Sequence, residues 1–124
     1  MLILHIAKRS DWMEAQSLGN YKTDSLETEG FIHCSKATQV IAVANFIFRG
    51  QRDLVLLGID VDKVVAEVRY ESGNSSQNDE LPDDKLYPHI YGPLNVDAVT
   101  HVVDFNPLQD GTFELPEAFR EKTD

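Results

Sequence analysis

Histidines are the residues of this sequence best suited to proton transfer or ligand binding. Of the four, His5, His33 and His89 lie in segments that are otherwise apolar or rigid. An imidazole changes its charge near neutral pH, so it can exchange protons, orient a hydroxyl group or bind a metal. A single histidine in a strand is more often structural, but three in separate apolar segments favour a shared site.

His89 carries the strongest indication of function. Pro88 fixes its own φ, and Gly92-Pro93 restrains the other end of the segment. His89 and Tyr91, two positions apart in an extended chain, are predicted to project from one face. His101 is the weakest candidate, because its segment is compatible with a solvent-facing strand.

Other chemistries lack a local motif. No histidine is followed by another at the spacing of a zinc site, and Cys34 would point away from His33 on a strand. A metal site assembled from His5, His33 and His89 stays an alternative. The chain has no nucleophile elbow, Walker loop or dinucleotide GxGxxG motif, and Cys34 is expected to be a small buried hydrophobe.

The first half of the chain supplies two predicted strands and two predicted helices that would position these residues. Strands are expected at residues 2–7 and 31–34. A weak helix is expected to begin with Ser10 as N-cap and to end at Gly19. A stronger helix is expected from about Lys36 to Arg49, capped by Ser35, after a polar connection over residues 20–30.

The second half is predicted to be mainly strands. They are expected at residues 54–60, 64–70, 98–105 and 112–115, with the second pairing with the first. Residues 71–84 are expected to form a long polar surface loop or to be locally disordered. Strands with one main helix and one or two short helices predict an α+β domain over residues 1–115, followed by a charged tail at 116–124.

The charge distribution excludes several function classes. The 124 residues contain 11 basic and 21 acidic side chains, for a net charge of -10. Residues 1–70 are nearly neutral, with nine acids and eight bases, so the acidity belongs to the second half. No basic run is present to bind a phosphate backbone, and a nucleic-acid partner is not expected.

No apolar run approaches the roughly 20 residues of a membrane-spanning helix. The N-terminus lacks signal-peptide features, so a cytoplasmic location and no membrane partner are expected. The single cysteine precludes an internal disulfide, and the oligomeric state is left unassigned.

Three segments together resemble a known family. They are the first strand with His5, the stretch FIHCS at residues 31–35, and the stretch YPHIYGPL at residues 87–94. They resemble domain of unknown function family 952, a small bacterial family, over roughly residues 1–115. That family is grouped with the ADP-ribosyltransferase-like superfamily, and the order of motifs is similar to the catalytic half of the RNA 2'-phosphotransferases.

This resemblance implies a split β-sheet fold and a cleft for NAD. Carried over by position, His5 would contact a ribose, His33 and Ser35 would line the second-strand side, and His89 and Tyr91 would occupy the third motif. His5, His33, His89 and Tyr91 are therefore the catalytic candidates, and His5, His33, Ser35 and Tyr91 the cofactor-binding candidates. The implied function is binding of NAD or a related small nucleotide, with transfer of ADP-ribose or cleavage of the N-glycosidic bond, and no metal is expected.

The sequence departs from the superfamily pattern at one decisive place. The third motif commonly supplies a glutamate, and none stands within residues 87–94. The phosphate-binding basic residues of the RNA phosphotransferases are also missing, so RNA phosphate removal is not expected.

Glu67 is expected at the surface and Asp79–Asp84 in a solvated loop. A catalytically inactive nucleotide- or protein-binding module and a histidine-lined metal site are the two alternatives.

Overall fold

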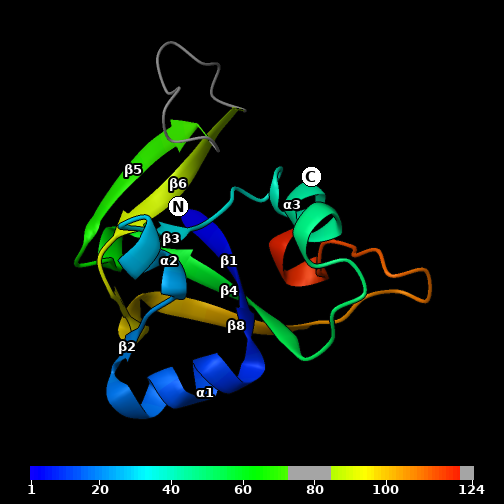
Figure 1. Ribbon diagram of the computed structural model, residues 1–124, viewed down its shortest axis with the longest axis horizontal. Helices are drawn as coiled ribbons and strands as arrows, with labels where there is room; N and C mark the ends of the chain where they lie inside the picture. The colour runs from blue at the N-terminus through cyan, green and yellow to red at the C-terminus, as the bar shows by residue number, and fades with distance from the viewer. Residues whose placement is uncertain (73–84, 121–124) are drawn as a thin grey trace.

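The part of the chain that the structure describes has an α+β fold of three small antiparallel sheets and three α-helices (Figure 1). The computed structural model describes residues 1–72 and 85–120, so most of the expected polar loop, with Asp79–Asp84, lies outside the described residues. The elements in chain order are β1 (Leu2–Lys8), α1 (Arg9–Leu18), β2 (Asn20–Tyr21), α2 (Asp24–Thr28), β3 (Ile32–His33), α3 (Val40–Ile47), β4 (Leu54–Asp60), η1 (Val61–Lys63), β5 (Glu67–Ser72), β6 (Leu86–Tyr91), β7 (Leu94–Asn95), η3 (Val96–Ala98), β8 (Val99–Phe105) and η4 (Glu117–Phe119).

The central sheet has the strand order β1-β4-β8, and β4 is its middle strand. Six consecutive residues of β4, Leu54–Ile59, are buried, as its continuous apolar sequence predicts for a strand covered on both faces. The expectation that residues 64–70 pair with this strand is wrong. Because β1 and β8 occupy both edges of β4, the chain turns away at η1, and β5 pairs with β6 instead.

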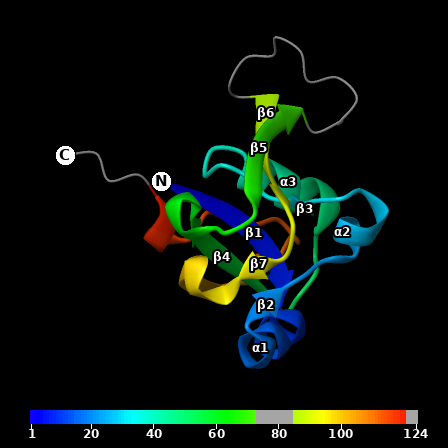
Figure 2. The same ribbon diagram turned by 90° about the vertical axis from the view of Figure 1, so that its left-hand side faces the viewer.

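The second and third sheets are β2-β7 and β3-β6-β5. Figure 2 shows the long hairpin of β5 and β6 standing away from the central sheet. An isolated bridge between Leu4 and Ser35 joins β1 to the chain just after β3, with both backbone hydrogen bonds at 2.8 Å. This bridge brings the strand that carries His5 beside the strand that carries His33.

The two longer helices differ from the expected ones at their starts. Helix α1 begins at Arg9, and its N-cap is Lys8 rather than Ser10. Helix α3 begins at Val40, because the backbone of Ser35 is committed to the bridge with Leu4 and is not available to cap a helix. The backbone N–H of Lys36 is instead satisfied by the Gln39 side chain at 2.8 Å.

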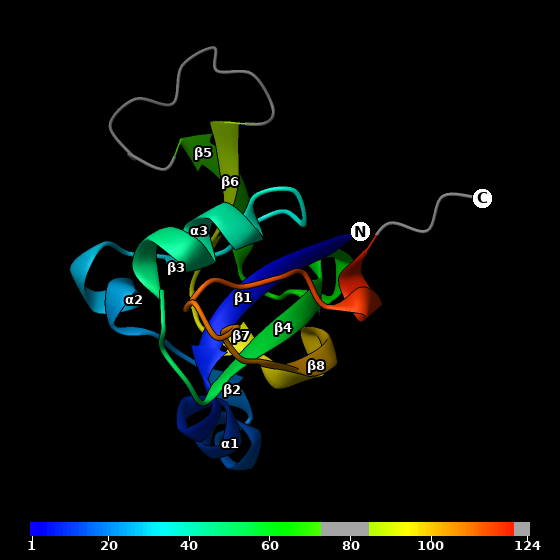
Figure 3. The ribbon, with the colours of Figure 1, turned by 90° about the vertical axis from the view of Figure 1, so that its right-hand side faces the viewer.

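The C-terminal segment packs against the core beyond the expected domain boundary at residue 115. The expected strand at residues 112–115 is absent, because the N–H of Phe113 donates to the Asn45 side chain at 2.7 Å rather than to a neighbouring strand. Phe119 in η4 is 7% exposed and packs into the core cluster that contains Leu4, Leu56 and Phe105. Figure 3 shows this segment, in orange and red, crossing beside β1 and β4.

In the described part of the chain the longest helix has ten residues, and no helix combines the length and the apolar character needed to cross a membrane.

Candidate functional site

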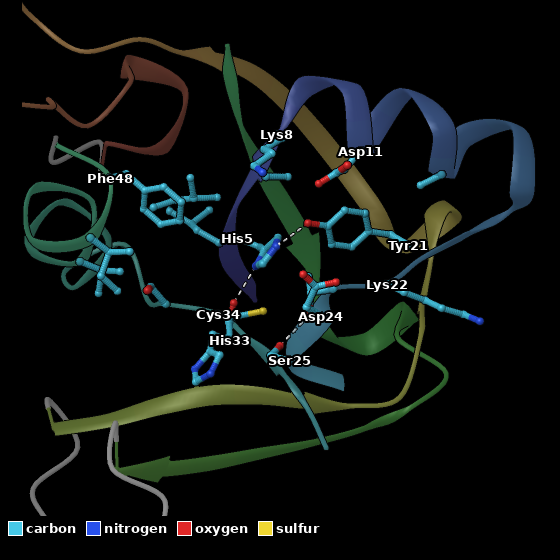
Figure 4. Close-up of a pocket in the computed structure, with 18 of the residues that line it drawn as sticks. His5, Lys8, Asp11, Tyr21, Lys22, Asp24, Ser25, His33, Cys34 and Phe48 are labelled. Carbon is cyan, nitrogen blue, oxygen red and sulfur yellow. Dashed lines mark hydrogen bonds between the residues drawn. The ribbon is translucent and has the colours of Figure 1, made fainter. Parts of the chain in front are cut away.

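One open pocket of about 1070 Å³ gathers four of the five predicted site residues. His5 comes from β1, His33 from β3, Ser35 from the bridge that follows β3, and His89 from β6. Tyr91 is not among the lining residues, although it lies close behind them. In Figure 4, His5 lies at the centre, with Phe48 on one side and Tyr21 on the other.

Both ring nitrogens of His5 are already hydrogen-bonded within the protein. Nδ1 lies 2.6 Å from the backbone carbonyl of His33, and Nε2 lies 2.8 Å from the hydroxyl of Tyr21. Burial lowers the pKa of His5 to about 4, so the ring is neutral at pH 7. Since a carbonyl only accepts hydrogen bonds, the proton is on Nδ1, and Tyr21 donates its hydroxyl proton to Nε2.

Tyr21 therefore presents the polar atom at this part of the pocket. Its hydroxyl proton is used by His5, so the oxygen is left as an acceptor. Burial raises the pKa of Tyr21, which keeps the phenol protonated. The resemblance implies that His5 itself contacts a ribose, whereas both nitrogens of His5 are bonded within the protein and Tyr21 lines the pocket beside it.

His33 lies at the exposed edge of the site. Its side chain is 47% exposed, and Nε2 forms a hydrogen bond of 3.0 Å with Glu29 from the turn after α2. The ring stands edge-on to Phe31 and to His89, with centroid distances of 4.8 Å and 5.4 Å. His33 thus lies at the edge of the pocket with its distal ring nitrogen held by Glu29.

Ser35 and Cys34 complete the wall near His33. Ser35 is 5% exposed, and its backbone makes the bridge to Leu4. Cys34 is 4% exposed, and burial raises its pKa, so the thiol stays protonated. A protonated buried thiol is a poor nucleophile, which agrees with the interpretation of Cys34 as a small hydrophobe.

His89 is the most deeply buried polar side chain of the site, at 1% exposure. Its Nδ1 lies 2.9 Å from Oε1 of Glu71, and the hydroxyl of Tyr91 donates to the same oxygen at 2.5 Å. His89 and Tyr91 therefore share one face of β6, as predicted. Among residues 1–72 and 85–120, Nε2 of His89 has no hydrogen-bond partner.

The charge state of this group follows from its contacts. Burial lowers the pKa of His89, which outweighs the opposite effect of Glu71. Burial alone would raise the pKa of Glu71, but the hydrogen bonds from Tyr91 and His89 outweigh it and lower that pKa. Burial and the Glu71 hydrogen bond raise the pKa of Tyr91. At neutral pH, therefore, the imidazole of His89 and the phenol of Tyr91 are both neutral, and both are hydrogen-bonded to the carboxylate of Glu71.

Sequence reasoning missed Glu71 and Tyr21. Glu71 was assigned to the polar loop, whereas it lies in β5, opposite Tyr87 of β6. The alternation of Glu67, Arg69 and Glu71 is the pattern that places these side chains on the face of His89 once β5 and β6 pair. Tyr21 lies in a connection predicted to be irregular, and no local pattern marks it.

The remaining pocket lining divides into an apolar wall and a charged rim. The apolar wall comes from α3 and its end, where Phe46 is 87% exposed and Ile47 is 62% exposed beside Val43 and Phe48. The charged rim holds two lysines and three acids: Lys8, Lys22, Asp11, Glu14 and Asp24. The pocket thus offers an apolar surface on one side and charges of both signs on the other.

Comparison with known proteins assigns the chain to a family. The profile of a family described as protein of unknown function (DUF952) matches residues 6–102. The chain belongs to this family. A crystal structure of CC0527 from Caulobacter crescentus is similar to it, at 30% identity and a TM-score of 0.78, over 93% of this chain and 95% of that one. A solution NMR structure of CC0527 gives a TM-score of 0.73 over 90% of each chain. No curated protein matches this chain.

The metal alternative requires free nitrogens on His5, His33 and His89 at one place in this DUF952 fold. Within the described ranges, no three His, Cys, Asp or Glu side chains are grouped so that they hold a metal ion. His5 has both nitrogens occupied, which removes one of the three histidines that the metal alternative requires. His101 lies outside the pocket lining and contacts Thr100 at 2.8 Å.

The chemistry available in this DUF952 pocket is hydrogen bonding and proton transfer. Tyr21 Oη and His89 Nε2 are both acceptors in the neutral site. A ligand that satisfies them must carry hydroxyl or N–H donors. The apolar wall of α3 suits a planar ring.

Proposed function

We propose that the pocket binds NAD or a related nucleotide, and that the bound nucleotide is cleaved at its N-glycosidic bond with transfer of ADP-ribose to water or another acceptor. One observation carries the proposal: His33, Ser35, His89 and the His5–Tyr21 pair converge on one pocket from separate elements. The expected resemblance to the ADP-ribosyltransferase-like superfamily, with NAD as its ligand, is part of this proposal.

The size and lining of the pocket support a nucleotide ligand. Small-molecule pockets are typically about 300–1,000 Å³, and a pocket of about 1070 Å³ has room for a dinucleotide. The exposed Phe46 and Ile47 side chains offer a surface on which a nicotinamide or adenine ring can pack. Lys8 and Lys22 are the lining cations that can approach a diphosphate.

Cleavage of this bond needs positioning more than it needs a strong acid. The nicotinamide ring of NAD is cationic and leaves as a neutral molecule, so its departure requires no proton donor. The protein has to orient the ribose and place the attacking hydroxyl. Tyr21, held by His5, accepts a hydrogen bond from a ribose hydroxyl, and no step of this scheme uses a metal.

Isothermal titration with NAD and with ADP-ribose tests the binding. We expect heat with the wild type and, because one hydroxyl acceptor is lost, an affinity about five- to tenfold lower with Tyr21→Phe. His101→Phe, a change of a histidine outside the pocket, is the control and should bind as the wild type does. Absence of heat at millimolar NAD in the wild type would contradict the proposal.

Nicotinamide release separates an enzyme from a binding module. A time course of NAD incubated with the protein should show free nicotinamide in proportion to protein concentration. Binding without release identifies the inactive nucleotide-binding module that the sequence left open.

A further inference from the structure

His89 is held from three sides on the outer face of the sheet β3-β6-β5. Phe31 stacks on its ring at a centroid distance of 4.0 Å and an interplanar angle of 19°. His33 stands edge-on at 5.4 Å, and Glu71 anchors Nδ1 at 2.9 Å. A ring fixed in this way has one orientation, so its second nitrogen points in one direction.

The contacts determine which nitrogen carries the proton. The carboxylate of Glu71 only accepts hydrogen bonds, so Nδ1 of the neutral His89 ring is protonated. Nε2 then carries a lone pair and acts as a base. Nε2 has no partner in the described part of the chain, although a buried polar atom without one is costly. A hydrogen-bond donor on a ligand in the pocket would satisfy this atom, because His89 lines the pocket.

We propose that His89 is the general base of the pocket and that Glu71 is the residue that positions it. This inference rests on the proposed cleavage of NAD. Nε2 takes a proton from the attacking water or acceptor hydroxyl, and the oxygen forms a bond to C1' of the ribose. The bond between C1' and the nicotinamide nitrogen breaks, and its electron pair goes to that nitrogen. His89 holds the proton as imidazolium beside Glu71 and then releases it to solvent.

Glu71 is suited to positioning and not to direct proton transfer. It is not among the residues that line the pocket, and Oε1 already accepts two hydrogen bonds. The guanidinium of Arg69 lies 4.4 Å from the centroid of the Tyr91 ring, which fixes the second donor to this oxygen. Glu71 thus supplies, from β5, the carboxylate that is missing from residues 87–94, and it acts through His89.

A ligand reaches Nε2 when a neighbour of His89 turns. Phe31 is 2% exposed, whereas the side chain of His33 is 47% exposed and its Nε2 is bonded to Glu29, whose side chain is 48% exposed. Rotation of His33 is therefore the smaller movement.

The protonation of His89 is tested by long-range ¹H–¹⁵N NMR on histidine-labelled protein, with the His89→Gln spectrum for assignment. We expect the ring to be protonated on Nδ1 with Nε2 bare, and the Nε2 signal to shift when NAD is added. Glu71→Gln should alter this pattern, because an amide can donate to Nδ1 as well as accept from it. A proton on Nε2 in the wild type would overturn the proposal.

The catalytic role is tested by the rate of nicotinamide release against pH. His89→Gln should lower kcat about 100-fold or more while NAD still binds, as expected when a general base is lost. Glu71→Gln should lower kcat at least about tenfold and move the acid limb of the profile to lower pH, because Glu71 raises the pKa of His89. His101→Gln, which changes an exposed histidine outside the pocket lining, is the matched control.

The outcomes separate this inference from the proposed function. If the wild type gives no heat with NAD, the proposed function fails. If the wild type binds NAD and releases nicotinamide, but His89→Gln does so at the same rate, only the base role fails. An unchanged pH profile in Glu71→Gln overturns the positioning role. Circular dichroism of each variant confirms that the fold is retained.

Discussion

At the scale of single residues, burial decides what each histidine can do. His5 and His89 are buried and have lowered pKa values, whereas His101 is exposed. A buried histidine with one nitrogen held by an acceptor is a neutral base with a defined tautomer. In His5 the basic nitrogen accepts a hydrogen bond from Tyr21. In His89 the basic nitrogen has no hydrogen-bond partner among the described residues.

The lowered pKa of His5 makes the stability of the protein depend on pH. The pKa is about 4 in the folded state and 6.5 in the unfolded state, so between these values the unfolded chain binds more protons. The stabilisation is present above pH 6.5 and is lost as the pH falls toward 4. We expect the free energy of unfolding to fall by about 2 kcal/mol between pH 7 and pH 5 from His5 alone, measured by urea denaturation.

His5→Gln removes this titrating group, so its stability should fall less steeply over the same pH range. Equal slopes in His5→Gln and the wild type would contradict the assignment of a neutral buried His5. The lowered pKa of His89 acts in the same direction, so its contribution is read from His89→Gln.

The candidate site was predictable from sequence only where residue type and local spacing carry the information. The same-face placement of His89 and Tyr91 follows from strand geometry and was predicted. Glu71 joins them only after β5 pairs with β6 in a particular register, which is a long-range property. The occupation of both nitrogens of His5 depends on the His33 carbonyl and the Tyr21 hydroxyl, which lie 28 and 16 residues away in two other sheets.

At the scale of elements, the close approach of η4 to β4 depends on Gly58. A Cβ at this position would lie 2.7 Å from Cε1 of Phe119 and 3.0 Å from Cβ of His101. We expect Gly58→Ala to destabilise the protein by about 1–3 kcal/mol, since the buried Phe119 ring has to move. Thermal or urea unfolding measures this change.

A double-mutant cycle identifies the contact responsible for the Gly58 effect. Phe119→Leu removes the ring atom that the new Cβ meets, so the two changes together should cost less than the sum of their separate effects. If the two destabilisations are strictly additive, Phe119 is not the cause of the Gly58→Ala effect. The cause is then the backbone conformation at residue 58 or the contact with His101.

Helix α3 shows what an apolar pattern can and cannot predict. Its helical spacing was sufficient to predict a helix, but the eight residues are so apolar that the pattern does not say which face is buried. Val40 and Ala44 are buried, whereas Phe46 and Ile47 face the pocket side and are exposed. The predicted start of the helix was wrong because Ser35 forms a bridge with Leu4, and local sequence does not reveal such a tertiary contact.

The exposed Phe46 side chain should matter for ligand binding and not for folding. Phe46→Ser should change the free energy of unfolding by no more than about 0.5 kcal/mol, because the side chain is 87% exposed. It should also weaken NAD binding about threefold or more, by removing a surface on which a ring packs. Val65→Ser, 84% exposed and outside the pocket lining, is the control, and equal NAD affinity in Phe46→Ser and the wild type would contradict the apolar wall.

At the scale of the whole molecule, the sequence predicted the α+β class but not the division of strands among sheets. The class follows from local patterns, which mark strands and helices one at a time. The division of strands among sheets depends on which strands pair with the two edges of β4. These are β1 and β8, which are distant from β4 in sequence. Phe119 extends the packed chain past residue 115 for a similar reason, since its partners lie in other elements.

The net charge of -10 opposes an anionic ligand at long range, so the charges near the pocket decide its affinity. Lys22 and Asp24 both line the pocket and are exposed. Exposed charge pairs contribute about 0.2–1 kcal/mol, or up to about a fivefold change in affinity. Lys22→Gln should therefore weaken NAD binding by up to about fivefold at low salt, and Asp24→Asn should strengthen it by a similar factor.

Salt distinguishes this local electrostatic effect from a change of shape. The Debye length is about 10 Å at 0.1 M salt and about 3 Å at 1 M, so both differences should nearly vanish at 1 M salt. Lys63→Gln, in η1 and outside the pocket lining, changes the net charge equally and should leave the affinity close to that of the wild type. If Lys63→Gln and Lys22→Gln weaken binding equally at low salt, the total charge governs NAD binding and the pocket rim does not.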